Sequence, residues 1–213
     1  MMGNYLKFVL SVLFLAVSNQ AFSESQSDNR AINWVMLSYM PSGTIKTETS
    51  YGSVASSENY DTSGLSLKVG KYIKNVGSDK KWDSSLYFIY SALNPKAKVA
   101  EESIDASYWG VGYDVYYHAS KVIEPYAGLS VGFSKFDYSY VKHYLYSPDI
   151  NLNLSDNALA YAGDIGVKFN LKDDVAIHVE WSYIAANNSD TQSGWTAKVT
   201  GISGFDLGFS KSF

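Results

Sequence analysis

The sequence predicts an all-β fold, because apolar residues recur at every second position over most of the chain. The clearest stretch is 108–133, which reads YWGVGYDVYYHASKVIEPYAGLSVGF. Two alternating runs flank a short polar turn there, and a period of two places successive side chains on opposite faces of a strand. One face carries Trp109, Val111, Tyr113, Val115, Tyr117, Ile123, Pro125, Ala127, Leu129, Val131 and Phe133. The stretch is therefore a β-hairpin with one apolar face and one small or polar face.

The length of these apolar faces indicates a membrane-spanning hairpin. Each face extends over about ten residues, which is the length that a tilted strand needs to cross a bilayer. Aromatic residues make up 15% of the chain, with 18 Tyr, whereas charged residues are only 18%. A membrane barrel with aromatic girdles at both interfaces has this composition. The fold class expected is therefore a closed, antiparallel, eight-stranded transmembrane β-barrel.

The connections between the expected strands alternate in length. Strands are expected at 32–40, 62–74, 82–93, 105–117, 123–137, 158–169, 175–184 and 199–213. Long polar loops are expected at 41–61, 94–104, 138–157 and 185–198, and short turns at 75–80, 118–122 and 170–174. Bacterial outer-membrane barrels have short periplasmic turns and long outer loops. Closure requires the last strand to pair with the first, because an open edge in lipid leaves backbone groups unpaired.

The facing of the first strand stays open at this level. Trp34, Met36 and Met40 compete with Val35, Leu37 and Tyr39 for the lipid side.

The N-terminal residues have the pattern of a secretory signal peptide. Lys7 precedes the uncharged run FVLSVLFLAV at 8–17 and the small-residue site at 21–23. The apolar run is too short for a spanning helix, so we expect a cleavable signal peptide at 1–23 and a barrel domain at 24–213. The alternative is an uncleaved amphipathic anchor.

Composition excludes several classes of function. The formal net charge is -4, which argues against nucleic-acid binding, because that function requires a concentrated basic patch. No cysteine occurs, which removes disulfides and thiolate metal sites. No metal-ligand spacing or phosphate-binding glycine loop is present, so no cofactor is expected.

The lumen face of the expected strands carries ionisable residues. An eight-stranded barrel is just wide enough for side chains to fill it. Charged groups enclosed there must be paired with opposite charges or hydrated. The interpretation is a structural polar network, and the alternative is a narrow ion or proton path that favours cations. The residues concerned are Lys68, Asp114, Glu124, Asp164, Lys168, His178, Glu180 and Asp206.

Three patterns suggest catalysis, and each has a structural interpretation. The G-x-S-x-G motif at 128–132 lies in mid-strand, where its serine cannot form a nucleophile elbow. His118 and Ser120 fall in a turn on the periplasmic side, away from the outer leaflet where a lipid A deacylase acts. His178 and Glu180 share a strand face and could exchange protons, but no nucleophile accompanies them. We therefore expect no enzyme.

The expected loop 138–157 is rich in tyrosine, which offers a large contact area and a polar tip at low entropic cost. The candidates for recognition are Tyr138, Tyr140, His143, Tyr144 and Tyr146. The alternative is that they extend the barrel wall above the membrane.

Several segments carry a resemblance to a known family. They are YWGVGYDVYY, EPYAGLSVGF, AYAGDIGVKFNLKDDVAIHVEWSY and the terminal GFDLGFSKSF. They resemble the small eight-stranded outer-membrane β-barrels of Gram-negative bacteria, namely the OmpX and Ail group and the OmpA transmembrane domain. The resemblance spans nearly all of 24–213. It implies that Phe205, Leu207, Phe209 and Phe213 form a signal for the barrel-assembly machinery.

The same resemblance implies a location and a range of tasks. The expected location is the bacterial outer membrane, with outer-membrane lipid, lipopolysaccharide, periplasmic chaperones and the barrel-assembly machinery as partners. The function it implies is non-enzymatic surface interaction, in adhesion or resistance to host defence, through loops that contact a host or surface ligand. A small pore or membrane-integrity protein is one alternative. A lipid A-modifying enzyme is another.

Overall fold

The computed structural model describes residues 32–76, 81–98, 102–142, 150–171 and 174–213. The expected signal peptide at 1–23 lies outside these residues. All elements in the described part are strands: β1 (Ile32–Tyr51), β2 (Val54–Val76), β3 (Trp82–Pro95), β4 (Glu102–Tyr117), β5 (Ile123–Lys142), β6 (Ile150–Asn170), β7 (Val175–Ala185), β8 (Asn188–Gln192) and β9 (Trp195–Ser212).

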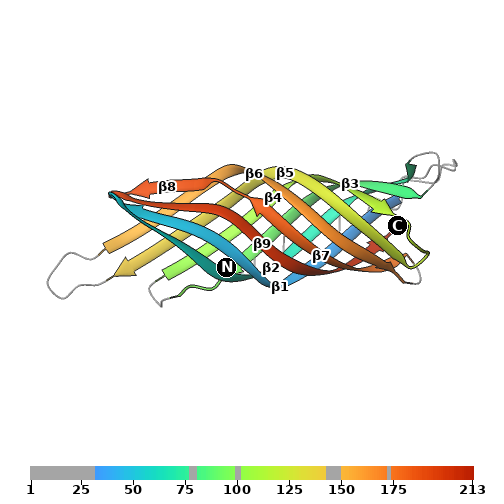
Figure 1. Cartoon of the computed structure of the whole chain (residues 1–213), viewed down its shortest axis with the longest axis horizontal. Helices are drawn as coiled ribbons and strands as arrows, with labels where there is room; N and C mark the ends of the chain where they lie inside the picture. Colours follow the sequence, from blue (N-terminus) through green and yellow to red (C-terminus); the bar gives the residue numbers. More distant parts are fainter. Residues whose placement is uncertain (1–31, 77–80, 99–101, 143–149, 172–173) are drawn as a thin grey trace.

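The strands close into an antiparallel barrel (Figure 1). Each strand from β1 to β6 pairs with the next, and β9 pairs with both β7 and β1. β7 and β8 lie one after the other along β9, since β7 pairs with 202–211 and β8 with 195–199. The two together therefore occupy one strand position, and the barrel is a ring of eight strands. The predicted fold class is confirmed.

An apolar belt surrounds the barrel. Outward side chains in its middle are aliphatic or aromatic and strongly exposed, as in Leu86, Leu129 and Ile165. Trp82 and Tyr117 pack together near the end that carries the 118–122 turn, at a ring-centroid distance of 4.8 Å. Rings exposed to lipid at this height suit the bilayer interface. No helix in the described part of the chain is long and apolar enough to cross a membrane.

The structure decides the facing of the first strand. Trp34, Met36 and Met40 are 1%, 1% and 3% exposed inside the barrel, whereas Leu37 and Tyr39 are each 49% exposed on the outside. Trp34 stacks on Tyr72 of β2 at 5.2 Å between ring centroids, so the lumen contains a large aromatic residue from β1.

The prediction of long outer loops is wrong. β1 and β2 continue through 41–61 and meet in a two-residue turn, with Tyr51 paired to Val54 and Gly52 at a φ of 58°. Likewise, β8 and β9 occupy most of 185–198, and β5 and β6 extend well into 138–157. The segment 94–104 is shorter than expected, because β3 ends at Pro95 and β4 begins at Glu102. These segments lack the apolar outward face on which the strand assignment depended, because they lie beyond the bilayer.

The polar hairpin formed by β1 and β2 should be strongly protected from hydrogen exchange. Peptides covering 44–51 and 54–61 should exchange about a hundredfold or more slowly than an unstructured chain, because a backbone ladder joins them. Exchange mass spectrometry of the protein in nanodiscs measures this, with the intrinsic rate of an unstructured chain as the reference. Exchange of the hairpin at that intrinsic rate would contradict the strand assignment.

Candidate functional site

Inside the membrane belt, the lumen is organised around one buried ammonium. Lys68 is 1% exposed, and its Nζ lies 2.9 Å from Oε2 of Glu180 and 3.6 Å from Oδ2 of Asp164. Tyr126 donates a hydrogen bond of 2.6 Å to the same Glu180 oxygen. A buried carboxylate is stable only with partners of this kind, so β2, β5, β6 and β7 are joined across the lumen.

Further acids surround this pair. Asp114 accepts a hydrogen bond of 3.0 Å from Tyr116, and Asp206 accepts one of 3.0 Å from Ser182. A Cβ at Gly128 would lie 2.0 Å from Asp114 Oδ1 and 2.8 Å from Asp164 Oδ1. A larger residue at this position would therefore push these carboxylates out of their present places. Side chains fill this section, as expected for eight strands.

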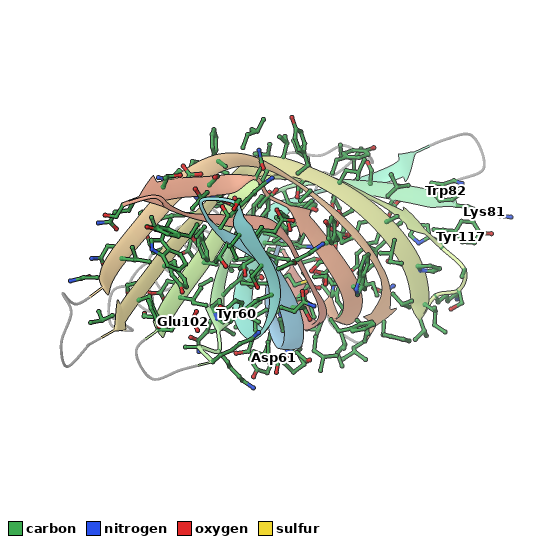
Figure 2. All side chains as sticks on the ribbon, turned by 60° about the vertical axis from the view of Figure 1, so that its left-hand side comes forward. Tyr60, Asp61, Lys81, Trp82, Glu102 and Tyr117 are labelled. Atoms are coloured by element: carbon green, nitrogen blue, oxygen red, sulfur yellow. The ribbon has the colours of Figure 1, made fainter. Side chains whose placement is uncertain are left out.

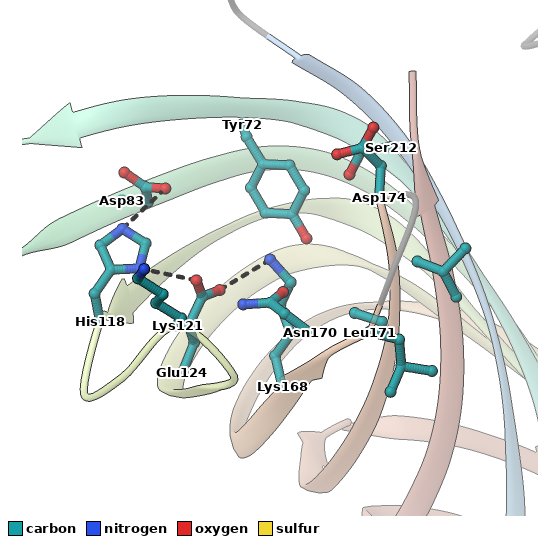
Figure 3. A pocket seen from close by; sticks show the side chains of 12 residues that line it. Tyr72, Asp83, His118, Lys121, Glu124, Lys168, Asn170, Leu171, Asp174 and Ser212 are labelled. Atoms are coloured by element: carbon teal, nitrogen blue, oxygen red, sulfur yellow. Dashed lines mark hydrogen bonds and ion pairs between the residues drawn. The ribbon is translucent and has the colours of Figure 1, made fainter.

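The lumen opens towards the turn-bearing end through a polar pocket of 330 Å³ (Figure 3). His118 lies there between two carboxylates, with Nε2 3.1 Å from Asp83 and Nδ1 2.8 Å from Glu124. Glu124 also pairs with Lys168 at 2.9 Å. Every ring nitrogen of this histidine is thus engaged, which makes it a structural link between β3, the 118–122 turn and β5.

Beyond the membrane belt, the polarity of the barrel is inverted. We call this part, comprising 43–62, 102–107, 134–141, 151–158 and 186–203, the outer extension. Its outward side chains are polar, as at Lys46, Glu48 and Asn153, and an apolar cluster fills its interior and the adjoining end of the membrane belt. The cluster comprises Met40, Ile45, Tyr60, Leu93, Ile104, Ala106, Tyr108, Phe136, Ala160, Ile184, Ala186, Val199 and Ile202. This cluster separates the polar lumen from the outer mouth.

The outer extension consists of two sheets rather than a continuous ring. Backbone ladders join β2, β1, β9 and β8 into one sheet and β4, β5 and β6 into the other. In the described part of the chain, no ladder joins β6 to β8, and the β2–β3 ladder stops at Thr62 and Pro95. Figure 1 shows the two groups of strands separating at the end opposite the C-terminus.

Side chains close the seam between β2 and β4. Tyr60 donates a hydrogen bond of 2.7 Å to Glu102, and Lys98 pairs with Glu58 at 2.9 Å while lying over the Tyr60 ring. Figure 2 shows Tyr60 and Glu102 together at this end, away from Trp82 and Tyr117. Burial, followed by the hydrogen bond to Glu102, raises the pKa of Tyr60 above its ordinary value. The tyrosine therefore remains a hydrogen-bond donor at neutral pH.

The seam between β6 and β8 is centred on Asn188, which is 1% exposed. Its Nδ2 donates to the carbonyl oxygens of Ser134 and Asp156 at 3.0 and 3.1 Å, and its Oδ1 accepts from the Ser134 hydroxyl. Farther out, the amides of Ser155 and Asn153 donate to side chains of Asp190 and Gln192, at 2.9 and 2.7 Å. Side-chain oxygens of β8 thus replace the missing backbone partners of β6.

An aromatic cleft of 180 Å³ lies between the two sheets at the outer mouth. One sheet contributes Thr49, Trp195, Thr196 and Ala197, and the other contributes Tyr138, Tyr140, Leu152 and Leu154. We call it the outer cleft. Among the described residues, its lining contains no carboxylate, ammonium or imidazole, and most of it is apolar. It therefore suits an uncharged group about the size of one ring.

A family comparison identifies the chain. Residues 8–208 match the model of the outer membrane protein beta-barrel domain. The chain belongs to this family. The outer membrane of bacteria is accordingly where it resides, with lipid and lipopolysaccharide around it, and the predicted localisation is confirmed. No curated protein matches the sequence.

Two solved structures, with TM-scores of 0.55 and 0.50, show the same fold. Neisserial surface protein A is 9% identical, with a TM-score of 0.55, over 85% of this chain and 97% of that one. AlkL, solved by NMR in lipid bilayers, is 14% identical, with a TM-score of 0.50, over 90% and 94%. Ail of Yersinia pestis is 15% identical, with a TM-score of 0.45, over 86% and 99%.

In this outer-membrane barrel, the residues expected in the lumen all point inward. Seven are buried, and Lys168 is half-buried at the periplasmic mouth. Phe205, Leu207 and Phe209 face lipid on β9, and Phe213 follows the end of that strand. Tyr138 and Tyr140 lie on β5 and point into the outer extension rather than standing in a loop. The other three candidates, His143, Tyr144 and Tyr146, lie outside the described residues.

The residues of the three patterns that suggested catalysis make structural contacts in the barrel. Ser120 accepts hydrogen bonds from the amides of Val122 and Ile123, which fixes the 118–122 turn. Ser130 of the G-x-S-x-G motif bonds to Tyr108 inside the lumen at 2.8 Å. His178 bonds to Ser210 at 2.8 Å.

Sequence patterns alone missed the residues that shape the outer cleft and its seams. Asn188, Trp195 and Glu102 all lie in segments expected to be loops. The sequence does contain one indication of a strand here, because Val199, Ala197 and Trp195 alternate with Lys198 and Thr196. The alternation is apolar inward and polar outward, opposite to that of the membrane belt.

Removing the buried ammonium should destabilise the barrel strongly. Lys68→Met leaves Glu180 and Asp164 buried without their cation, which costs about 3–5 kcal/mol of unfolding free energy. Urea unfolding in lipid vesicles, followed by tryptophan fluorescence, measures the loss. Lys71→Met, at an exposed position on the same strand, is the control and should change stability little. Equal stability of the two variants would contradict the role given to Lys68.

Asn188→Ala should loosen the seam between β6 and β8. The change removes the two hydrogen bonds that the Asn188 amide donates to the carbonyl oxygens of Ser134 and Asp156, at a cost of about 1–3 kcal/mol. Hydrogen exchange should rise in 188–192 and 153–156 while the membrane belt stays protected. Asn187→Ala, at an exposed position beside it, is the matched control. Unchanged exchange in both variants would show that the side chain does not hold the seam.

Proposed function

We propose that this outer-membrane barrel is a non-enzymatic surface-recognition protein and that its outer extension contacts the partner. The outer cleft carries the proposal. It combines Trp195 of one sheet with Tyr138 and Tyr140 of the other, at the mouth farthest from the periplasmic turns. Partially exposed aromatic pockets of this kind anchor partners, because an inserted apolar group buries much area at low entropic cost.

The two sheets provide a firm frame for the cleft. Paired strands form both walls, and the apolar cluster beneath them fills the space between the sheets. A binding surface built on paired strands loses less conformational entropy on binding than a flexible loop does. Adhesion and resistance to host defence are the tasks that this proposal favours, since both require contact outside the cell.

The alternative functions receive less support from the geometry. A pore needs a water-filled path, and the apolar cluster lies between the polar lumen and the outer mouth, where it disfavours such a path. A lipid A-modifying enzyme needs a nucleophile or activated water near the outer leaflet. His118 and Ser120, the pair that suggested this chemistry, lie in a turn at the opposite end and are engaged in structural contacts.

Truncating the aromatic walls of the cleft should abolish binding while the barrel still folds. Cells that display Tyr140→Ala/Trp195→Ala should lose attachment to cultured epithelial cells and extracellular matrix, by about tenfold or more, because hot-spot aromatics dominate such contacts. Flow cytometry counts attached cells, and heat-modifiable gel mobility reports folding.

The matched control removes polar groups from the outward face of the same extension. Lys46→Ala/Glu48→Ala leaves the cleft intact and should keep attachment. Loss of attachment in this control alone would place recognition on the outward face and overturn the assignment to the cleft. Absence of attachment in all three proteins, with folding confirmed, would overturn the recognition function itself.

A further inference from the structure

The side chains of the outer cleft indicate the chemical class of ligand that it fits. Aromatic side chains line it from both sheets, with Trp195 on one and Tyr138 and Tyr140 on the other. The 180 Å³ between them is about the size of one six-membered ring. Because the cleft is the one that carries the proposed function, the ligand class deepens that function and rests on it.

Stacking partners hold the aromatic walls in place. Tyr51 packs on Trp195 at 4.8 Å between ring centroids. Phe136 stacks on Tyr138 at 6.3 Å, with 19° between the ring planes. Neither Tyr51 nor Phe136 belongs to the cleft lining, so the walls are supported by residues that a ligand does not touch. A ligand therefore meets rings that are already ordered, which reduces the entropic cost of binding.

Three polar groups of the cleft are available to a ligand. They are the Thr49 hydroxyl, the Tyr140 hydroxyl and the Trp195 indole N–H, and none has a hydrogen-bond partner among the described residues. All three residues are half-buried. An apolar ligand would remove water from these groups without replacing its hydrogen bonds, which is unfavourable. A ligand that carries hydroxyl groups would replace them.

The charge around the cleft disfavours an anionic ligand. The described lining contains no cationic side chain. Glu102 lies next to the lining, because it pairs directly with Tyr140 across the β4–β5 ladder. Its Oε1 accepts a hydrogen bond from Tyr60 at 2.7 Å, and its Oε2 accepts one from the amide of Lys98 at 3.0 Å. An anion would meet a like charge here, whereas a cation would find this carboxylate already engaged in the seam.

A neutral sugar ring with equatorial hydroxyl groups meets these requirements. Both faces of such a pyranose carry axial C–H groups, and its hydroxyl groups project around the edge. The face of an aromatic ring is electron-rich and attracts polarised C–H groups, so aromatic residues on both sides of a cleft suit this ring. Glucose is an example. Galactose differs by one axial hydroxyl, which would point at one of the walls.

We propose that the outer cleft binds a neutral, all-equatorial pyranose of a glycan on the surface of the target cell. The faces of the sugar ring pack on Trp195 and Tyr138, and the hydroxyl groups at its edge bond to Tyr140 and Thr49. An anionic sugar finds no cation in this cleft, and an apolar side chain leaves Tyr140 and Thr49 without partners.

The test titrates four small probes onto the full-length protein in lipid nanodiscs, which contain no glycoside detergent. The probes are methyl β-D-glucopyranoside, methyl β-D-galactopyranoside, methyl β-D-glucuronide and N-acetylphenylalaninamide, and saturation-transfer NMR measures their binding. The glucoside should bind about threefold or more tightly than each of the others, the effect of one hydrogen bond gained or one repulsion avoided. Absence of glucoside binding, or equal or tighter binding of another probe, would overturn the proposal.

Two conservative variants locate the sugar in the cleft. Tyr140→Phe and Thr49→Val each remove one hydroxyl and nearly keep the shape of the side chain, so each should weaken glucoside binding about threefold to tenfold. Tyr161→Phe, at an exposed lipid-facing position outside the cleft, is the matched control and should bind as the unmodified protein does. Heat-modifiable mobility verifies that each variant folds. Unchanged glucoside binding in both cleft variants would contradict the proposal.

Attachment of expressing cells separates this proposal from the proposed function. If cells attach but the purified protein does not bind the glucoside, surface recognition stands and the sugar is the wrong ligand. If the glucoside binds but no cells attach, the ligand class stands and recognition of host cells is wrong. Inhibition of attachment by free glucoside, and not by free galactoside, would support both.

Discussion

The structure depends on one constraint, which is that backbone hydrogen bonds in lipid must be satisfied within the protein. An unpaired amide or carbonyl in the hydrocarbon region costs several kcal/mol, so the ladder between β1 and β9 has to close the ring. Closure with eight strands then fixes the diameter and leaves room for side chains only. The Lys68 network and the tight approach at Gly128 follow from that limited space.

The same constraint ends where the bilayer ends. Outside the membrane, water can satisfy a strand edge, and the ring separates into two sheets joined by side chains such as Asn188 and Glu102. The solvent preference also reverses there, so apolar residues such as Ile45 and Val199 turn inward and polar residues turn outward. In the described part of the chain, no backbone ladder joins the two sheets at this height, and the outer cleft lies between them.

The alternation of residues explains which parts of the fold could be predicted. In 108–133, lipid on one face and a polar lumen on the other give a strong contrast, and the hairpin, the turn and the facing were all predicted correctly. In 41–61, the outward and inward residues are both mostly small or polar, so the pattern predicts a loop although the segment is part of two paired strands. Facing of the first strand stayed open because Trp34 and Leu37 are equally apolar, and only the closed ring shows which one enters the lumen.

The sequence by itself determined the transmembrane part of this protein, because the bilayer imposes a period of two that local residues must obey. It also determined which ionisable side chains face the lumen, since they occupy the positions between the lipid-facing ones. Tertiary structure alone decided that Lys68 meets Glu180, which is 112 positions away in the chain. It alone placed Trp195 and Tyr138 around the same cleft, because the strand register and the closure of the ring set the positions of these side chains.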